Sequence, residues 1–366
     1  MKKILLIAVA ALMAISASAQ ETIKKVYLYK GENVVVAQNY DDIDSIVFVD
    51  FIIPETPENL NFQPKAFTVN SQGKQVYFSQ GNLQYQASTK NWRFAENQYD
   101  MIGDDNANTN STYEGWIDLF GWGTSGYNNT VNDPFAVNYQ PWSTSTGQLN
   151  QLSTFKGTEI ESVNCEMQAI TGHCDTTWVG GGTYKSDDVN YYGYGPSTCM
   201  TDPSLTSTSA KYDWGVYNAI SNGGNEKGQW RTLTYAEWNY IFYSRPLAKY
   251  LRSQATVCGV HGYVLLPDDF TLPDGLSWSY QTNNWDTNTY DAQTWITMEA
   301  TGAVFLPAAG YRYGSSVYDV GSAGDYWSAS CDLQNYAGGM RFDSDGADLG
   351  IDYRYLGFSV RLVQDL

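Results

Sequence analysis

Histidine and basic residues are scarce in this chain of 366 residues. Its two histidines, His173 and His261, lie in different regions, so a metal site built mainly from imidazole would need carboxylates for most of its ligands. Lysine and arginine number 21 against 39 acidic residues, which gives a formal net charge of -18. Such an acidic surface repels phosphate backbones, which argues against nucleic acid as a partner, but it can attract divalent cations.

Long apolar runs are also lacking, except at the N-terminus. Lys2 and Lys3 precede the apolar segment 4–15, which is too short for a comfortable membrane span. Ala17-Ser-Ala19 supplies the small residues that a signal peptidase needs. We therefore expect a signal peptide over 1–19, the alternative being an uncleaved anchor. No later stretch is apolar enough to cross a bilayer, so we expect an exported protein of the cell surface, extracellular space or periplasm that is not an integral membrane protein after cleavage.

Cysteine is sparse as well, with five residues in all. An exported chain can form disulfides. Cys165 and Cys174 are near enough in sequence to close a short loop, and Cys199 and Cys258 could pair or stay reduced. Because the count is odd, at least one thiol stays free unless chains crosslink. Cys331 could be a core thiol or half of a disulfide.

Aromatic residues are abundant by contrast: they make up 15% of the chain, almost as much as the 16% that is charged. Tyrosine and tryptophan together with glycine, serine and asparagine are typical of surfaces that bind by stacking and adaptable hydrogen bonds. The alternative is that many of these tyrosines are structural residues on the surfaces of β-strands.

The order of apolar runs and turn residues predicts two folded parts. Short strands at 26–29 and 34–37 indicate a small β module over 20–53, and the prolines at 54 and 57 indicate a semi-rigid linker over 54–66. The main domain should span 67–366. Its stretch 125–212 has few aliphatic residues and reads as a long irregular insertion.

One helix has a clear start signal in the main domain. Thr234 is a good N-cap residue and Glu237 follows three positions later, which predicts a capping box for a helix over 232–242. Short strands are expected around 67–94, 260–267, 303–307, 326–342 and 358–363. The domain therefore reads as α+β with strands dominating.

Four phrases in the last 140 residues carry a family resemblance. They are Trp230-Arg-Thr-Leu-Thr-Tyr-Ala-Glu-Trp238, Phe305-Leu-Pro-Ala-Ala-Gly-Tyr-Arg-Tyr313, Tyr326-Trp-Ser-Ala-Ser330 and Gly357-Phe-Ser-Val-Arg-Leu-Val363. In this order they resemble the formylglycine-generating-enzyme-like branch of the C-type lectin fold. The nearest resemblance is to secreted Bacteroidetes proteins that also resemble the Fibrobacter succinogenes major paralogous domain.

The resemblance implies a C-type-lectin-like domain, a display scaffold that hosts binding more often than chemistry. In such folds a long loop region carries the ligand surface, which we expect here over 125–212 and around 311–331. Sugar rings stack on flat aromatic faces, although core packing is the alternative for any one aromatic residue. The candidate ligand-binding residues are Tyr191, Tyr192, Tyr194, Tyr311 and Tyr313.

Catalytic residues are not expected. Formylglycine-generating enzymes bind copper through two cysteines near the C-terminus, whereas the stretch 328–354 holds Cys331 alone, and Cu(I) needs two soft donors. A Gly-x-Ser-x-Gly elbow is absent. Glycoside hydrolysis needs two carboxylates in one cleft, and the sequence singles out no pair among its many acidic residues.

Structural calcium is the most plausible cofactor, because carboxylate and amide oxygens recur at alternating positions in two stretches. Members of the resembled fold often bind calcium, which favours this reading. The alternative is an Asx-rich turn whose side chains bond their own backbone. The candidate ligands are Asp104, Asn106 and Asn108 in one stretch and Asp343, Asp345 and Asp348 in the other.

These observations favour a non-catalytic exported binding or adhesion protein that recognises a glycan or a protein. Two alternatives stay open: an enzyme of the formylglycine-generating superfamily with a degenerate site, and a structural component of the cell surface or of pili.

Overall fold

The computed structural model describes residues 25–30, 33–39, 65–108, 110–127, 140–142, 210–332 and 336–366. It divides the chain into two compact units, Met1–Leu60 and Asn61–Leu366. In the first unit, β1 (Lys25–Lys30) and β2 (Asn33–Asn39) pair as an antiparallel hairpin. The expected signal peptide and nearly all of the expected linker and insertion lie outside the described residues.

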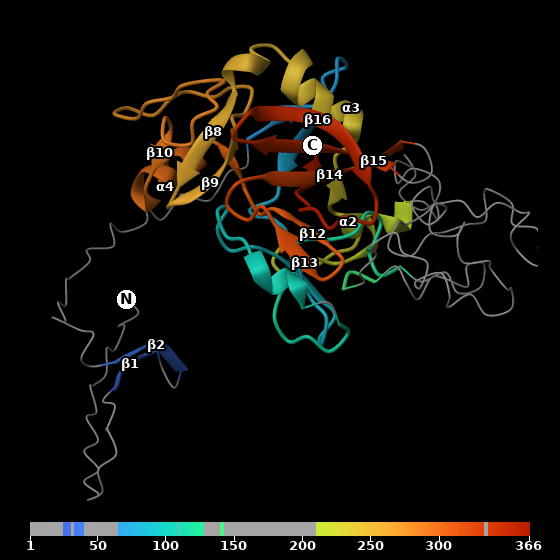
Figure 1. Cartoon of the computed structure of the whole chain (residues 1–366). Helices are drawn as coiled ribbons and strands as arrows, with labels where there is room; N and C mark the ends of the chain where they lie inside the picture. The colour runs from blue at the N-terminus through green and yellow to red at the C-terminus, as the bar shows by residue number, and fades with distance from the viewer. Residues whose placement is uncertain are drawn as a thin grey trace, which may run out of the picture. The chain divides into compact units, whose positions relative to one another are not determined.

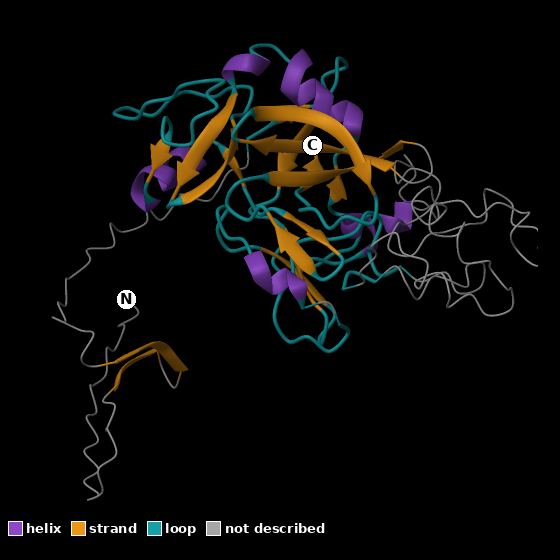
Figure 2. Cartoon of the chain, in the orientation of Figure 1, coloured by secondary structure: helices purple, strands orange, loops and turns teal. Residues whose placement is uncertain are grey.

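Strands dominate the second unit (Figure 2), which confirms the α+β prediction. Its strands are β3 (Phe67–Thr68), β4 (Gln75–Phe78), β5 (Leu83–Gln86), β6 (Asn91–Phe94), β7 (Arg231–Thr232), β8 (Arg252–Val257), β9 (Val260–Leu265), β10 (Thr289–Tyr290), β11 (Val304–Pro307), β12 (Tyr311–Tyr313), β13 (Ser316–Tyr318), β14 (Gly324–Asp332), β15 (Tyr336–Asp343), β16 (Gly346–Tyr353) and β17 (Leu362–Asp365). Its helices are η2 (Gly103–Ala107), η6 (Ala210–Tyr212), α2 (Trp214–Tyr217), α3 (Tyr235–Asn239), η7 (Tyr240–Ser244), η8 (Ala248–Tyr250) and α4 (Ala292–Ala300).

The two ends of the second unit meet in one sheet of order β3-β4-β17-β7. The last strand, β17, lies antiparallel to β4, with Val363 opposite Phe78, and antiparallel to β7, with Leu362 opposite Thr232. Two further sheets have the orders β10-β8-β9-β11 and β14-β15-β16, and β5-β6 and β12-β13 are hairpins (Figure 1). The segment that holds β12–β16, which builds the surface considered below, therefore lies between β7 and the closing strand β17 in the sequence.

Helix α3 starts with the expected capping box. The backbone N–H of Glu237 donates to Thr234 Oγ1 at 3.1 Å, and the N–H of Thr234 donates to Glu237 Oε2 at 2.8 Å. These two bonds satisfy N–H groups that a helix start otherwise leaves open. The helix continues into the single π-helical turn η7, and Trp238, Ile241 and Phe242 are buried as the sequence pattern predicts.

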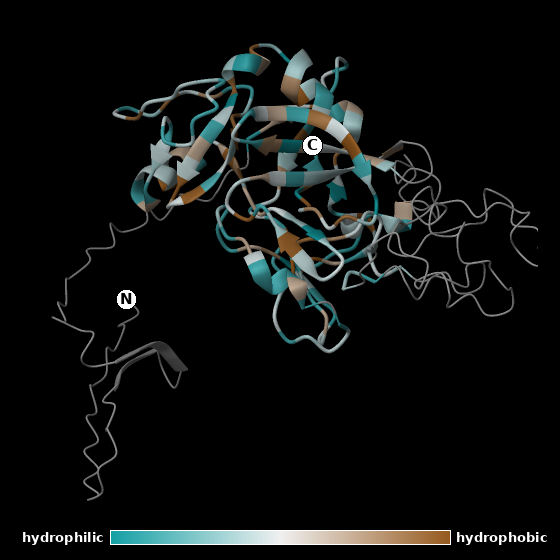
Figure 3. Cartoon of the chain, viewed as in Figure 1, coloured by the Kyte–Doolittle hydropathy of each residue, from teal (hydrophilic) through white to brown (hydrophobic). Residues whose placement is uncertain are grey.

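Apolar packing fixes the sheet β14-β15-β16 on one side. Tyr326, Met340 and Phe342 belong to a buried cluster with Trp238. Hydrophobic and hydrophilic residues are interleaved along β16 (Figure 3), as expected where successive side chains point to opposite faces of a sheet. The second face of this sheet is consequently free to carry polar groups. None of the helices in the described part of the chain is long and apolar enough to span a membrane.

Candidate ligand-binding site

The candidate site lies where strands β14, β15 and β16 present charged residues beside the hairpin β12–β13. Asp325 of β14 is directly opposite Arg341 of β15, and Arg341 is opposite Asp348 of β16. Opposite residues of an antiparallel pair share a face. Two positions along β15, Gly339 is opposite Gly350, so this pair of glycines shares that face as well.

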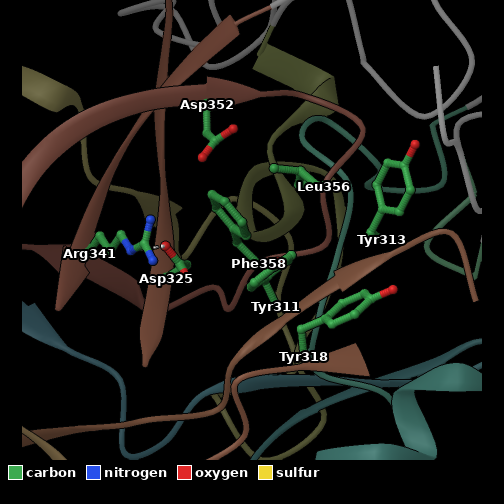
Figure 4. Close-up of a pocket in the computed structure, with 8 residues that line it drawn as sticks. All are labelled: Tyr311, Tyr313, Tyr318, Asp325, Arg341, Asp352, Leu356 and Phe358. Atoms are coloured by element: carbon green, nitrogen blue, oxygen red, sulfur yellow. Dashed lines mark ion pairs between the residues drawn. The ribbon is translucent and has the colours of Figure 1, made fainter. Parts of the chain in front are cut away.

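A cavity of about 370 Å³ opens at this face. Figure 4 shows Asp325, Arg341 and Asp352 on one side of it and tyrosines of the β12–β13 hairpin on the other. The volume is in the range of sites for small ligands, which combine apolar walls with a few convergent polar groups. The cavity is lined by Tyr311, Tyr313, Tyr318, Asp325, Arg341, Asp352, Leu356 and Phe358.

Asp325 is the least exposed charged group of the cavity: only 5% of its side chain is accessible. Its nearest charged partner is Arg341, whose Nε lies 3.7 Å from Asp325 Oδ1, which is beyond hydrogen-bond distance. Within the described residues, no donor forms a hydrogen bond to this carboxylate. The Asp325 oxygens are not among the sealed side-chain atoms that lack a partner, and Asp325 lines the cavity, so its carboxylate has acceptor capacity open to a ligand there.

The surroundings of Asp325 shift its titration. Burial raises the pKa of Asp325 to about 7; Arg341 acts against this rise, while the negative charges of Asp352, Asp319 and Asp343 add to it. Burial likewise raises the pKa of Asp352. Two carboxyl groups that ionise less readily than usual and one arginine therefore line the cavity.

Arg341 is itself loosely held. Its side chain is 54% exposed, and its Nη2 lies 3.7 Å from Asp343 Oδ2, as distant as its Nε is from Asp325. Two carboxylates thus share one guanidinium, and neither makes a close hydrogen-bonded pair with it. The guanidinium can turn toward a ligand at small cost, because an exposed ion pair contributes little stability.

The aromatic wall is rigid by comparison. Tyr311 and Tyr318 are opposite residues of the β12–β13 hairpin, and their rings stack at 5.4 Å with an angle of 22°. Tyr318 is 43% exposed, so the ring stacked on Tyr311 still presents surface to solvent. The buried Arg312 lies between these tyrosines in sequence and donates to the carbonyl oxygens of Leu119 and Gly314, which anchors the hairpin.

A row of tyrosine rings leads away from the cavity. Tyr313 contacts Tyr355 edge-on at 5.7 Å, Tyr355 stacks on Tyr353 at 5.0 Å, and Tyr353 stacks on Tyr336 at 4.6 Å. Both faces of Tyr353 are covered by its neighbours. The row therefore stiffens the surface beside Tyr313 through aromatic packing.

A second hollow of about 240 Å³ adjoins the first. The two share Asp325, Arg341, Asp352 and Phe358. Beyond these four residues, the second hollow is lined by Gly339, Met340, Asp348, Leu349, Gly350 and Ile351. The cavity consequently continues as a groove across β15 and β16.

The structure brings together only some of the residues that the sequence singled out. Tyr311 and Tyr313 line the cavity, whereas Tyr191, Tyr192 and Tyr194 lie outside the described residues. The sequence analysis did not identify Tyr318, Asp325, Arg341 and Asp352. The nearest signal for Asp325 was its position directly before the phrase Tyr326-Trp327, but acidity alone did not distinguish it from the other acidic residues.

The first candidate calcium stretch is held by internal hydrogen bonds. Asn106 is buried, its Oδ1 accepts from the backbone N–H groups of Asp118 and Leu119, and its Nδ2 donates to Asp118 Oδ1 at 2.8 Å. Asn108 Nδ2 donates to the Asp105 carbonyl oxygen, and Asp104 is exposed. The amide oxygen of Asn106 thus already serves two donors, while a calcium role for this stretch remains a prediction.

The second candidate calcium stretch is a turn between β15 and β16. Asp343 Oδ1 accepts from the N–H of Asp345, as in an Asx turn, and Asp348 Oδ1 accepts from the Tyr243 hydroxyl at 2.8 Å. Calcium binding by Asp343, Asp345 and Asp348 also remains a prediction. Across the described ranges, no group of three or more histidine, cysteine, aspartate or glutamate side chains could hold a metal ion.

The cysteines of the described part differ in state. Cys331 takes part in a disulfide, whereas Cys258 is a free thiol. Cys258 follows one of the two alternatives that the sequence left open for it. A sulfur within a disulfide is not a thiolate, so Cys331 in this state does not supply a copper ligand.

Comparison of the chain with protein-family models, with curated proteins and with solved structures finds no match. The site therefore rests on its own geometry.

Proposed function

We propose that this chain is a non-catalytic exported binding or adhesion protein, built on a C-type-lectin-like scaffold, that recognises a glycan in the cavity between the β12–β13 hairpin and β14–β16. Export rests on the N-terminal signal pattern, and the scaffold rests on the four phrases of the resemblance. The return of β17 to a place beside β4 and β7 supports the scaffold, because that fold brings its two ends together in this way.

The observation that carries the proposal is the Asp325 carboxylate, which is buried but accepts no hydrogen bond from the described residues. Sugar hydroxyls are neutral donors that fit between a carboxylate and a guanidinium, since each hydroxyl donates to one and accepts from the other. Asp325 and Arg341 offer this combination at the cavity. The exposed ring of Tyr318 offers a flat surface on which the apolar side of a sugar ring can stack.

A protein ligand fits less well. An aromatic surface rich in tyrosine also suits protein recognition, but the cavity is small and its polar groups converge on one point. This geometry favours a ligand with several hydroxyl groups close together.

The direct test is an array of defined glycans probed with the wild-type protein and with Asp325→Asn. We expect saturable binding to a subset of glycans, weakened about tenfold or more in the variant, because a charged acceptor contributes more than a neutral one. If Asp325→Asn left glycan binding unchanged, the assignment of this cavity as the binding site would be wrong. Capture of a cell-envelope protein without any glycan binding would favour a protein ligand instead.

One observation favours a second candidate function, glycoside hydrolysis. Asp325 and Asp352 line the same cavity, and a carboxyl group with a pKa of about 7 is suited to act as a general acid. Incubation of a bound oligosaccharide with wild-type protein and with Asp352→Asn decides between the two. Release of new reducing ends by the wild type, but not by Asp352→Asn, would show that the protein is a glycoside hydrolase and not a non-catalytic binding protein.

A further inference from the structure

Gly350 lies in the floor of the groove next to the cavity, and packing does not account for a glycine at this position. Glycine weakens the interior of a strand, and it often marks a place where a ligand or another backbone comes close. A Cβ atom built on Gly350 meets nothing within 4 Å. Its backbone is not in the left-handed region either, so any residue could adopt its conformation.

The opposite residue behaves differently. A Cβ atom on Gly339 would lie 2.8 Å from the backbone oxygen of Tyr326, so close packing of β14 and β15 explains this glycine. The pair Gly339–Gly350 leaves a strip of bare backbone across two strands. This strip lies in the second hollow, which shares Asp325 with the cavity.

The cavity and the second hollow together extend over residues of β14, β15 and β16. We propose that this groove takes a glycan chain of several residues, with one sugar bound at Asp325 and the next residues lying over Gly339 and Gly350. This inference rests on the proposed function and specifies the class of ligand as an extended chain. Asp348, opposite Arg341 on the same sheet, lines the second hollow, where it can accept hydrogen bonds from the hydroxyls of a neighbouring sugar residue.

The test uses Gly350→Leu and the smaller Gly350→Ala. Both side chains project into open space, so the fold should persist, and thermal unfolding followed by circular dichroism checks this. The ligands are chains of one to six residues of glucose, N-acetylglucosamine, mannose, xylose and galactose, measured by isothermal titration calorimetry. The full chain is used throughout.

In the wild type, Kd should fall about tenfold or more between the monosaccharide and the hexasaccharide of the sugar that binds best. Gly350→Leu should raise the hexasaccharide Kd about tenfold while the monosaccharide Kd stays within about twofold, with Gly350→Ala in between. Saturable binding of the hexasaccharide would also support an extended glycan ligand if the monosaccharide bound too weakly for its Kd to be measured.

Two outcomes overturn the inference alone. The first is an equal Kd for all chain lengths, and the second is a hexasaccharide Kd unaffected by Gly350→Leu, in each case with binding still lost in Asp325→Asn. A wild-type protein that binds none of these sugars would reject the proposed function together with the groove.

Discussion

Asp325 is directly opposite Arg341 in the antiparallel pair β14–β15, yet their nearest charged atoms are 3.7 Å apart. The arginine is half exposed and lies equally far, at 3.7 Å, from Asp343. A largely buried carboxylate that faces the cavity is thus left without a close donor, and its burial disfavours the charged form. The favourable free energy of folding of the rest of the unit offsets this local destabilisation.

The free energy of unfolding should therefore depend on pH, because Asp325 ionises within the range tested. The pKa of Asp325 is raised from 3.8 to about 7 in the folded state, so ionisation disfavours folding. The penalty is absent below about pH 4, grows as the pH rises toward 7 and is complete above it. At about 1.4 kcal/mol per pKa unit, Asp325→Asn should be more stable than wild type at pH 8 by as much as about 4 kcal/mol. Urea unfolding at pH 4 and pH 8 measures this difference.

The control for this prediction is Asp343→Asn, whose side chain is 37% exposed and which should show no comparable gain at pH 8. A stability difference between Asp325→Asn and wild type that is the same at both pH values would contradict the burial argument.

Glycan affinity should depend on the exposed ring of Tyr318. Tyr318→Ala removes the stacking surface and should weaken binding by about 1 kcal/mol, or roughly fivefold to tenfold. Tyr280 is a control of similar exposure, because it is also about half exposed, at 50%, and contacts another tyrosine, Tyr250, edge-on, but does not line the cavity. Equal losses in Tyr318→Ala and Tyr280→Ala, measured by titration calorimetry, would mean that the ring makes no specific contact.

Asn106 should matter for folding whether or not calcium is added. Asn106→Ala leaves the backbone N–H groups of Asp118 and Leu119 without their acceptor, and it removes a donor from Asp118, whose pKa burial raises to about 6. Each buried group left without a partner costs about 1–3 kcal/mol. We therefore expect a loss of at least about 2 kcal/mol in the free energy of unfolding. If added calcium stabilised wild type but not Asn106→Ala, this asparagine would be a ligand rather than a structural bridge.

The capping box of α3 offers a simpler test. Thr234→Ala should lower the free energy of unfolding by about 1 kcal/mol, whereas Thr234→Ser, which keeps the accepting hydroxyl, should cost only a few tenths. Equal midpoints of urea unfolding for the two variants would show that the bond from Glu237 N–H to Thr234 Oγ1 adds nothing.

Local sequence signals identified much of the fold. The helix start at Thr234 and Glu237, and strands such as Phe67–Thr68 and Val304–Pro307, follow from short-range chemistry: capping, turn residues and apolar patterning. The π-helical turn after Asn239 was not predicted, because a one-residue widening of a helix leaves no mark in the period of so short a segment.

The candidate site was only partly accessible from sequence. Tyr311 and Tyr313 stood out because they belong to an aromatic phrase, and they do line the cavity. Asp325 did not stand out, since its importance comes from burial and from a partner sixteen residues away, at Arg341. The same is true of Gly350, whose open surroundings depend on the register of β15 and β16.

The amino-acid sequence by itself determined the acidic charge, the capped helix and the strand-rich character of this protein, because each depends on composition or on neighbours within a few residues. Only the tertiary structure decided which carboxylate is buried, which tyrosine stays exposed and where a glycine leaves the backbone bare. These properties arise from strand register and from packing between distant segments, and a linear pattern does not record which of its many similar residues will meet.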